Sequence, residues 1–157
     1  MKQLFSFWAL LATLGPCGYF IFPGTVGTLA TVPLVYFLGQ LNLNIVAYTF
    51  VTFIIFLVSF PIVDRALALL DNGNDPSEIV IDELVGFLIT FIGIEVTPQR
   101  ILIGFFLFRF FDITKFFGIN RIELMHGARG VILDDVVAGI YSNIVLHLLI
   151  YFGRYVV

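Results

Sequence analysis

Charged side chains are scarce in this sequence of 157 residues. Only 12% of the residues are charged, whereas 60% are hydrophobic and the mean hydropathy is +1.05. Soluble domains carry about 25% charged residues on average. A chain with half that share has too few charges to cover a water-exposed surface, so the composition predicts an integral membrane protein. At this length we expect a single domain over residues 1–157.

Cysteine and histidine are also scarce. Cys17 is the only cysteine, which excludes an intrachain disulfide bond. His126 and His147 lie far apart in the sequence, and no Cys/His pattern typical of a zinc site is present. The net charge of −3 argues against a nucleic-acid partner, because such proteins neutralise phosphates with Lys and Arg. A metal site in this chain would therefore use oxygen ligands, which favour hard cations such as Mg²⁺.

Several apolar segments approach the length of a membrane span, which is about 20 residues. The clearest are residues 43–63, which carry no charge, and residues 136–152. Shorter apolar segments cover residues 28–41, 84–94 and 101–111. Together they predict an all-α, polytopic membrane bundle with about 4–5 membrane-embedded helices. Residues 1–22 lack a small-x-small cleavage site, so we expect an interfacial or half-inserted helix there rather than a removed signal peptide.

The loops between these segments divide the charges unequally between the two sides of the membrane. If each segment crosses once, loops 15–27, 64–83 and 112–135 share one side. That side holds most of the basic residues, namely Lys2, Arg65, Lys115, Arg121 and Arg129, with Arg109 close by. The positive-inside rule assigns this side to the cytoplasm. All acidic residues except Glu95 fall there too, which predicts an acidic site facing the cytoplasm.

The first acidic segment, residues 75–86, has the pattern of a helix start. Asp75 suits the N-cap, Pro76 the first helical position and Glu78 the third, which together form a capping box. Glu78 and Asp82 would then share one helical face, with Glu83 beside Asp82. The pattern therefore predicts a helix that enters the membrane with three carboxylates near its start.

Two further acidic segments follow. Arg109, Asp112 and Lys115 are spaced by three, which predicts that they lie along one helical face. Asp134 and Asp135 enter an otherwise apolar helix. Ionised carboxylates at such positions cost several kcal/mol unless a cation compensates them. We expect Mg²⁺ as that cation. Its candidate ligands are Glu78, Asp82, Glu83, Asp112, Asp134 and Asp135.

An all-carboxylate metal site beside cationic side chains has the parts needed for phosphate chemistry. The metal polarises a phosphoryl oxygen and lowers the pKa of a bound water, and an arginine can hold a phosphate through two hydrogen bonds. A carboxylate that is not a ligand can act as general acid or base. At a membrane surface the substrate would be a lipid with a phosphate head group. The candidate catalytic residues are Asp82, Glu83, Asp112, Asp135, Arg109 and Lys115.

The glycine-rich segment 22–30 has two interpretations. Its glycines permit close backbone approach, and N–H groups at the start of a following helix could hold an anion. The alternative is a close helix–helix contact between small residues. On the first interpretation, the candidate substrate-binding residues are Thr25, Thr28, Arg109, Lys115 and Arg129.

Four motifs in this chain resemble those of the phosphatidylglycerophosphatase A family. They are Pro-Gly-Thr-x-Gly-Thr at 23–28, Asp-Pro-Ser-Glu-Ile-Val-Ile-Asp-Glu at 75–83, Phe-Arg-x-x-Asp-Ile-x-Lys at 108–115 and Asp-Asp-x-x-Ala-Gly at 134–139. The resemblance spans about residues 15–150. It implies an all-helical, Mg²⁺-dependent enzyme of the bacterial inner membrane. Such an enzyme hydrolyses phosphatidylglycerophosphate to phosphatidylglycerol and phosphate at a site that faces the cytoplasm.

Segment 116–129 departs from the family pattern. Phe116 follows Lys115 where the family usually has proline, and Gly127-Ala-Arg-Gly replaces a Gly-Gly-x-Gly stretch. The lipid specificity therefore stays open, and one alternative is a broader lipid phosphate or diphosphate phosphatase. A second alternative is a small cation transporter. That alternative would place acids near the middle of the spans, whereas here they gather at the cytoplasmic ends.

Overall fold

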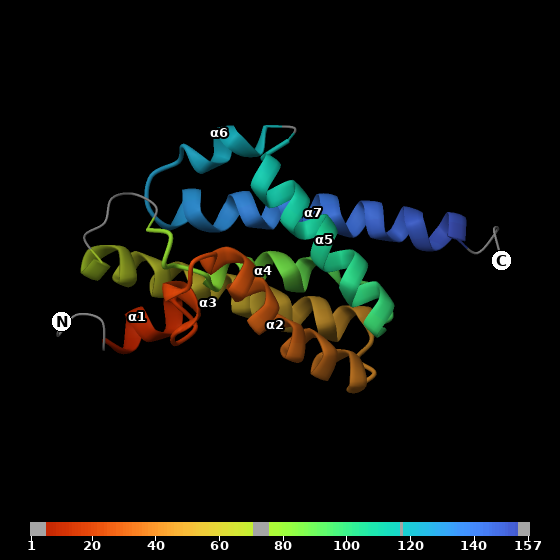
Figure 1. Ribbon diagram of the computed structural model, residues 1–157. Helices are drawn as coiled ribbons and strands as arrows, with labels where there is room; N and C mark the ends of the chain where they lie inside the picture. The colour runs from red at the N-terminus through yellow and green to blue at the C-terminus, as the bar shows by residue number, and fades with distance from the viewer. Residues whose placement is uncertain (1–5, 71–75, 117, 154–157) are drawn as a thin grey trace.

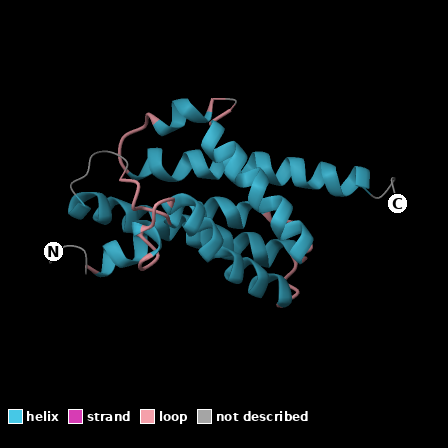
Figure 2. Ribbon diagram, viewed as in Figure 1, coloured by secondary structure: helices cyan, strands magenta, loops and turns pink. Residues whose placement is uncertain are grey.

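The computed structural model describes residues 6–70, 76–116 and 118–153, and its secondary structure over these ranges is helical (Figures 1 and 2). The elements in chain order are α1 (Phe7–Ala12), the short 3₁₀ helix η1 (Cys17–Tyr19), α2 (Pro23–Gln40), α3 (Ile45–Leu70), α4 (Ile81–Thr90), α5 (Pro98–Thr114), α6 (Ile119–Glu123) and α7 (Ala128–Gly153). Proline stands in the first turn of both α2 and α5, where its missing N–H costs nothing. The predicted all-α class is confirmed.

Helix α4 lies at the centre of the bundle. It packs mainly against α7 and also contacts α2, α3 and α5. Figure 1 shows α7 on one side of α4 and the α2–α3 pair on the other, with α5 crossing α7. This arrangement places the helix that carries Asp82 and Glu83 directly against the helix that carries Asp134 and Asp135.

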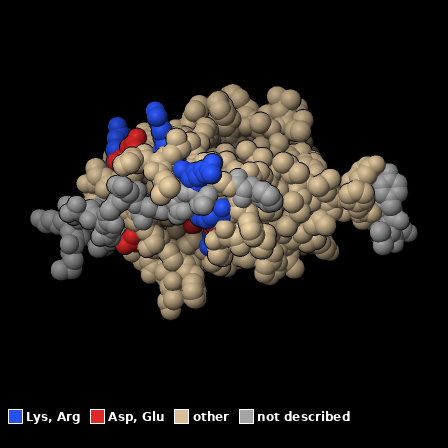
Figure 3. Space-filling view, turned by 90° about the horizontal axis from the view of Figure 1, so that it is seen from above, with Lys and Arg blue, Asp and Glu red and all other residues tan. Residues whose placement is uncertain are grey.

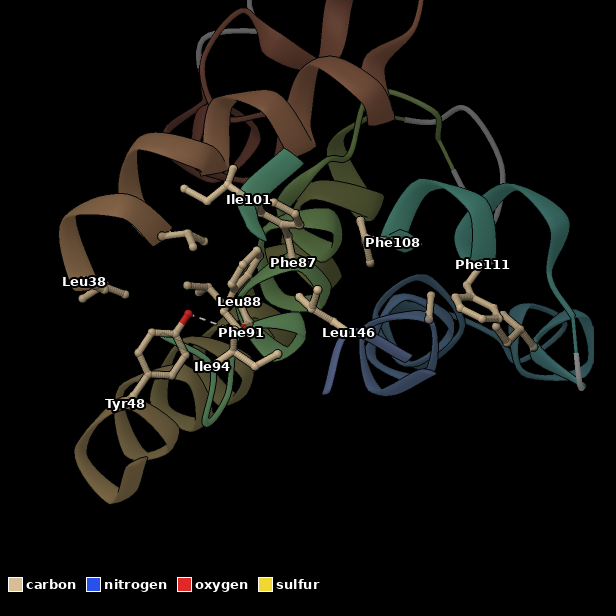
Figure 4. Packing of buried hydrophobic residues seen from close by; sticks show 13 residues of the cluster. Leu38, Tyr48, Phe87, Leu88, Phe91, Ile94, Ile101, Phe108, Phe111 and Leu146 are labelled. Atoms are coloured by element: carbon tan, nitrogen blue, oxygen red, sulfur yellow. Dashed lines mark hydrogen bonds between the residues drawn. The ribbon is translucent and has the colours of Figure 1, made fainter. Parts of the chain in front are cut away.

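Aromatic side chains form the core around α4 (Figure 4). Phe87, Phe91 and Phe108 are at most 1% exposed. The ring centroid of Phe87 lies 5.2 Å from that of Phe91 and 6.0 Å from that of Phe108. Tyr48 of α3 joins this core by donating its hydroxyl to the carbonyl of Leu88 at 3.2 Å. Edge-to-face and tilted ring contacts add about 0.5–1.5 kcal/mol per pair beyond burial, and these contacts fix α4 against α5.

Two of the described helices are long and apolar enough to cross a membrane, Ile45–Leu69 within α3 and Ala128–Gly153. Both carry large apolar side chains on their outer surfaces, such as Phe50 and Ile144, which are 63% and 51% exposed. On the face shown in Figure 3, charged residues gather toward one end of the molecule and the other end carries none in the described part. This distribution suits a lipid-facing belt with a polar end.

Helix α4 is shorter than a membrane span. The segment expected at 84–94 forms a helix of 10 residues at Ile81–Thr90, about 15 Å long and half the apolar thickness of a bilayer. The chain leaves α4 inside the bundle, where the Asn143 amide donates to the carbonyls of Thr90 at 3.0 Å and Ile92 at 2.9 Å. The polar Asn143 within the apolar helix α7 therefore supplies hydrogen bonds to backbone carbonyls at the end of α4.

The boundaries of α4 and α7 differ from the predicted ones. The helix predicted from the capping box begins at Ile81, and residues 76–80 form a turn; Asp75 lies outside the described residues. The backbone N–H of Val80 donates to the carbonyl of Ala12 at 2.9 Å, so this segment bonds to the N-terminal part of the chain instead of starting a helix. Helix α7, in contrast, begins at Ala128, before the predicted residue 136, and includes both aspartates.

The N-terminal part of the chain forms a broken helix rather than one continuous segment. Helix α1 spans six residues and is followed by a turn and η1, while residues 1–5 lie outside the described ranges. Helix α1 packs against α3, and the guanidinium of Arg65 lies 3.9 Å from the ring centroid of Trp8. The expected interfacial position of residues 1–22 stays a prediction.

Helices α4 and α7 approach each other through two glycines. A methyl group added at Gly139 would meet the carbonyl group of Gly86, 3.0 Å from its carbon atom. We therefore expect Gly139→Ala to destabilise the protein by about 1–3 kcal/mol, because the helices must separate. The measurement is the melting temperature in detergent. Gly153→Ala in the same helix is the control, since no atom of the described residues lies within 4 Å of its added methyl group. Equal melting temperatures of the two variants would contradict this prediction.

Candidate functional site

A cavity of about 200 Å³ lies where α2, α4, α5 and α7 meet the turn before α4. The three acidic segments of the sequence come together here, as the sequence predicts. The charged residues that line the cavity are Asp82, Glu83, Arg109, Asp112, Lys115, Asp134 and Asp135. Ser77 of the turn and Gly24 of α2 also line it. Both belong to motifs that the sequence marks, but neither was predicted as a site residue.

The five carboxylates form two groups that share Asp135. Asp82, Glu83 and Asp135 make the first group, and Asp112, Asp134 and Asp135 make the second. In each group one carboxylate oxygen from every residue lies within 4.8 Å of the others, and all five residues are at most 8% exposed. Buried carboxylates this close repel one another, so each group needs a positive partner.

Two cationic side chains supply positive charge to the second group. Arg109 donates to Asp112 at 2.5 Å, and Lys115 donates to the other oxygen of Asp112 at 3.1 Å. Lys115 also forms an ion pair with Asp134. Lys115 directly follows the last residue of α5. Its φ of 49° lies in the left-handed region, which ends the helix, and its side chain lines the cavity. The predicted alignment of Arg109, Asp112 and Lys115 is confirmed.

The first group has no such neutralisation. Arg109 approaches Glu83 at 3.8 Å, a longer ion pair than the one it forms with Asp112. Within the described residues, three buried carboxylate oxygens have no hydrogen-bond partner: Oδ1 of Asp82, Oε2 of Glu83 and Oδ1 of Asp135. Each unpartnered buried polar atom costs about 1–3 kcal/mol, and more when it is charged. All three oxygens belong to the first group, which is therefore the part of the cavity that fits a cation.

Proton affinities at the start of α4 agree with this interpretation. Burial raises the pKa of Asp82 well above its usual value, and the charges of Glu83 and Asp135 raise it further. Burial also raises the pKa of Glu83, to about 7. Burial alone would lower the pKa of Lys115, but the carboxylates around it outweigh this effect and raise that pKa. Without a cation Asp82 and Glu83 therefore bind protons more readily than ordinary carboxyl groups do, whereas Lys115 stays charged.

The start of α2 closes one wall of the cavity. A methyl group at Gly24 would meet the Glu83 carboxylate and would come within 2.9 Å of the Arg109 guanidinium. Gly27, one turn later, lies against the side chain of Val80, and a methyl group added at Gly27 would lie 2.7 Å from the Val80 Cβ. The predicted close approach through small residues is therefore present, although its partners are the turn before α4, α4 itself and α5.

Four of the predicted site residues do not line the cavity. Thr25 is half-buried, and the hydroxyl of Thr28 is buried and donates to the carbonyl of Gly24 at 2.8 Å. Glu78 is half-buried in the turn before α4 and belongs to neither carboxylate group. Arg129 is exposed in the first turn of α7. Their binding roles stay predictions.

A larger cavity, of about 490 Å³, lies at the opposite end of the bundle, where the α2–α3 and α4–α5 connections meet. Its one carboxylate is Glu95, whose side chain is 79% exposed and forms an ion pair with Arg100 at 2.8 Å. An exposed pair of this kind leaves no unbalanced charge. Size therefore does not mark the functional site in this bundle, and the carboxylate cavity is the chemical candidate.

Comparisons with known proteins agree with the motifs. Residues 10–150 match the phosphatidylglycerophosphatase A family. The chain is 39% identical to phosphatidylglycerophosphatase A of Haemophilus influenzae over 128 residues, which cover 79% of this chain and 76% of that protein. It is 31% identical to the Escherichia coli protein of the same name over 130 residues, which cover 81% and 73%.

A shorter match joins the chain to a Bacteroides thetaiotaomicron protein with the provisional name phosphatidylinositol-3-phosphatase. The two are 40% identical over 77 residues, so the match spans about half of each protein, 47% of this chain and 48% of the relative. No solved structure matches the chain. From the family match and the two longer alignments, the chain belongs to the phosphatidylglycerophosphatase A family.

Proposed function

We propose that this protein hydrolyses phosphatidylglycerophosphate to phosphatidylglycerol and phosphate in glycerophospholipid biosynthesis. The observation that supports it most is the cavity in which three unpartnered carboxylate oxygens lie beside Arg109 and Lys115. Two relatives of the same family carry the name of this activity. A lipid phosphomonoester is negatively charged. The cavity holds two cationic side chains, Arg109 and Lys115, and unpartnered carboxylate oxygens that can bind a metal cation.

The donor set fits one divalent cation, and we assign it to Asp82, Glu83 and Asp135. All donors are carboxylate oxygens, which suits Mg²⁺. Asp112 and Asp134 already face Arg109 and Lys115, so the ligand set is narrower than the six carboxylates that the sequence suggests. When bound, Mg²⁺ would polarise a phosphoryl oxygen and lower the pKa of a water for attack on phosphorus.

The side chains around this position would hold the phosphate. Arg109 lines the cavity and donates to Asp112 through one terminal nitrogen, and a guanidinium has five N–H donors, so others can hold phosphate oxygens. Asp112 fixes both cations by accepting from Arg109 and from Lys115. Because these charges are placed before substrate arrives, they stabilise the negative charge of the phosphoryl group without reorganisation during the reaction.

The arrangement of the helices supports a multi-pass position in the membrane. Helices α3 and α7 are long enough to cross, and α2 and α5, with 18 and 17 residues, lie near the lower limit of about 17. With the enclosed α4, this gives the predicted four to five membrane-embedded helices. The excess of Lys and Arg at the end with the carboxylate cavity favours the cytoplasmic side of the bacterial inner membrane.

Phosphate release by the purified protein tests this function. The substrates are phosphatidylglycerophosphate, phosphatidate and phosphatidylinositol 3-phosphate, the last because of the shorter match described above. We expect release from phosphatidylglycerophosphate at a rate at least about tenfold above the other lipids, and loss of release in EDTA that added Mg²⁺ restores. Undiminished activity in EDTA would contradict the metal assignment, and similar rates on all three lipids would favour a broader specificity.

A cation transporter is the non-enzymatic alternative. The carboxylates lie at one end of the bundle, and the charged residues that line the cavity at the other end are limited to Glu95 in the described part. A transport path would need ionisable groups through the middle of the bundle. Entry of Mg²⁺ into liposomes that contain the protein, without phosphate release from any lipid, would support the transporter and contradict the phosphatase.

A further inference from the structure

An open apolar groove of about 620 Å³ runs along the outer face of α5, outside the carboxylate cavity. Its lining includes residues spaced by three and four positions, which places them on one helical face. These residues are Ile103, Phe106, Leu107, Phe110 and Ile113, together with Arg109. Phe106 and Ile113 are 64% and 67% exposed, so the groove is open to whatever surrounds the helix.

Arg109 connects this groove to the carboxylate cavity. It lines both, whereas Phe108 and Phe111 of the same helix are buried in the bundle. Two other apolar grooves, one between α1 and α2 and one beside α3, α4 and α7, share no lining residue with the cavity. Of these three grooves, the α5 groove is therefore the one that shares a lining residue, Arg109, with the carboxylate cavity.

We propose that the α5 groove seats an acyl chain of the phospholipid substrate while the phosphate of the same molecule lies at Arg109. This inference rests on the proposed lipid phosphatase function and names the part of the protein that recognises the lipid tail. A phospholipid needs an apolar surface that begins within a glycerol unit of the phosphate site. The groove satisfies this requirement, since it passes Arg109 and extends from Ile113 to Ile103, about 15 Å along the helix.

The groove orients the lipid more than it binds it. An acyl chain in a bilayer is already surrounded by apolar neighbours, so its transfer to an apolar protein surface contributes little affinity. Fixing the chain along α5 instead restricts the positions of the head group relative to Arg109 and the carboxylates. Loss of such orientation lowers the reaction rate even when the chemical groups are intact.

Two serine variants of α5 separate this role from general packing. Phe106 lines the groove, whereas Leu102 on the same helix is 60% exposed and does not. We expect Phe106→Ser to lower kcat/KM by about tenfold for long-chain phosphatidylglycerophosphate and by less than about twofold for its water-soluble dihexanoyl form. Leu102→Ser should match the parent protein on both substrates. Equal losses on the two substrates, or no loss on either, would overturn the proposal.

Photocrosslinking tests the same inference without turnover. The parent protein is placed in phosphatidylcholine vesicles, in EDTA to prevent hydrolysis, with phosphatidylglycerophosphate that carries a diazirine in one acyl chain. We expect its crosslinks to concentrate on residues 103–113, whereas phosphatidylcholine with the same diazirine should label the exposed apolar surfaces of α3 and α7 as well. Identical labelling by both lipids would overturn the groove assignment. Absence of phosphate release from every lipid would instead contradict the phosphatase activity and leave the crosslinking result to decide the groove.

Discussion

Asp135→Asn is expected to lower phosphate release from phosphatidylglycerophosphate by about 10²–10³-fold or more, the largest effect of any single change in the cavity. Asp135 belongs to both carboxylate groups, is 2% exposed and keeps one oxygen without a partner. Asparagine preserves the shape and removes the charge, so the change acts on the cation and leaves the packing of α4 against α7 in place. Measurement of phosphate release across Mg²⁺ concentrations checks this expectation.

The same variant should have an opposite effect on stability when no metal is bound. In EDTA we expect Asp135→Asn to melt at a higher temperature than the parent. Folding of the parent must either bury this charge among other carboxylates or bind a proton there, and asparagine requires neither. Mg²⁺ should raise the melting temperature of the parent more than that of the variant, since a ligand stabilises the state that binds it.

Glu95→Gln, at the exposed ion pair with Arg100, is the control for both readouts and should behave as the parent. Parent-like release by Asp135→Asn, or an equal Mg²⁺ shift in both proteins, would remove the assignment of the metal to the first carboxylate group.

Arg109→Lys is expected to lower kcat/KM by about 10²-fold while Mg²⁺ binding changes little. Lysine keeps the charge but lacks the planar fork that holds Asp112 and a phosphate at the same time. The guanidinium reaches Asp112 at 2.5 Å and Glu83 at 3.8 Å and still has an unpartnered Nε. Calorimetric titration with Mg²⁺ beside steady-state kinetics separates the loss of phosphate contact from a loss of metal.

Arg100→Lys is the matched change at the other end of α5, where the arginine pairs with Glu95. It should leave both kcat/KM and Mg²⁺ binding as in the parent. If Arg109→Lys retains the parent kcat/KM, Arg109 serves only as a counter-charge and the phosphate-binding role is wrong. If it loses Mg²⁺ binding as well, the guanidinium supports the carboxylate groups rather than the substrate.

Much of the site could be predicted from the sequence because the signals are local. Charged residues are rare in this chain, so a carboxylate at the edge of an apolar segment indicates a functional or structural role. This criterion identified Asp82, Glu83, Asp112, Asp134 and Asp135. Spacing by three placed Arg109 beside Asp112 correctly, since neighbours on one helix are fixed by helical geometry.

Predictions that depended on other parts of the chain were less accurate. The capping box favoured a helix from Pro76, but the bond from Val80 to the carbonyl of Ala12 holds this segment as a turn. Glu78 lies in this turn, outside α4, so it does not share a helical face with Asp82, and its metal-binding role stays a prediction. A local pattern reports what a segment prefers alone, and here a distant backbone carbonyl offered a better partner.

The sequence by itself therefore determined a helical chain for a lipid environment, the acidic segments and their basic neighbours. The tertiary structure decided which carboxylates share a group, which oxygens stay unpartnered and that Arg109 lies between the cavity and the α5 groove. The carboxylates of α4 and α7 lie close together because these two helices pack closely, through the contact of Gly86 with Gly139. Helical periodicity places a side chain on a face, but only the packing of two helices sets how closely their charges meet.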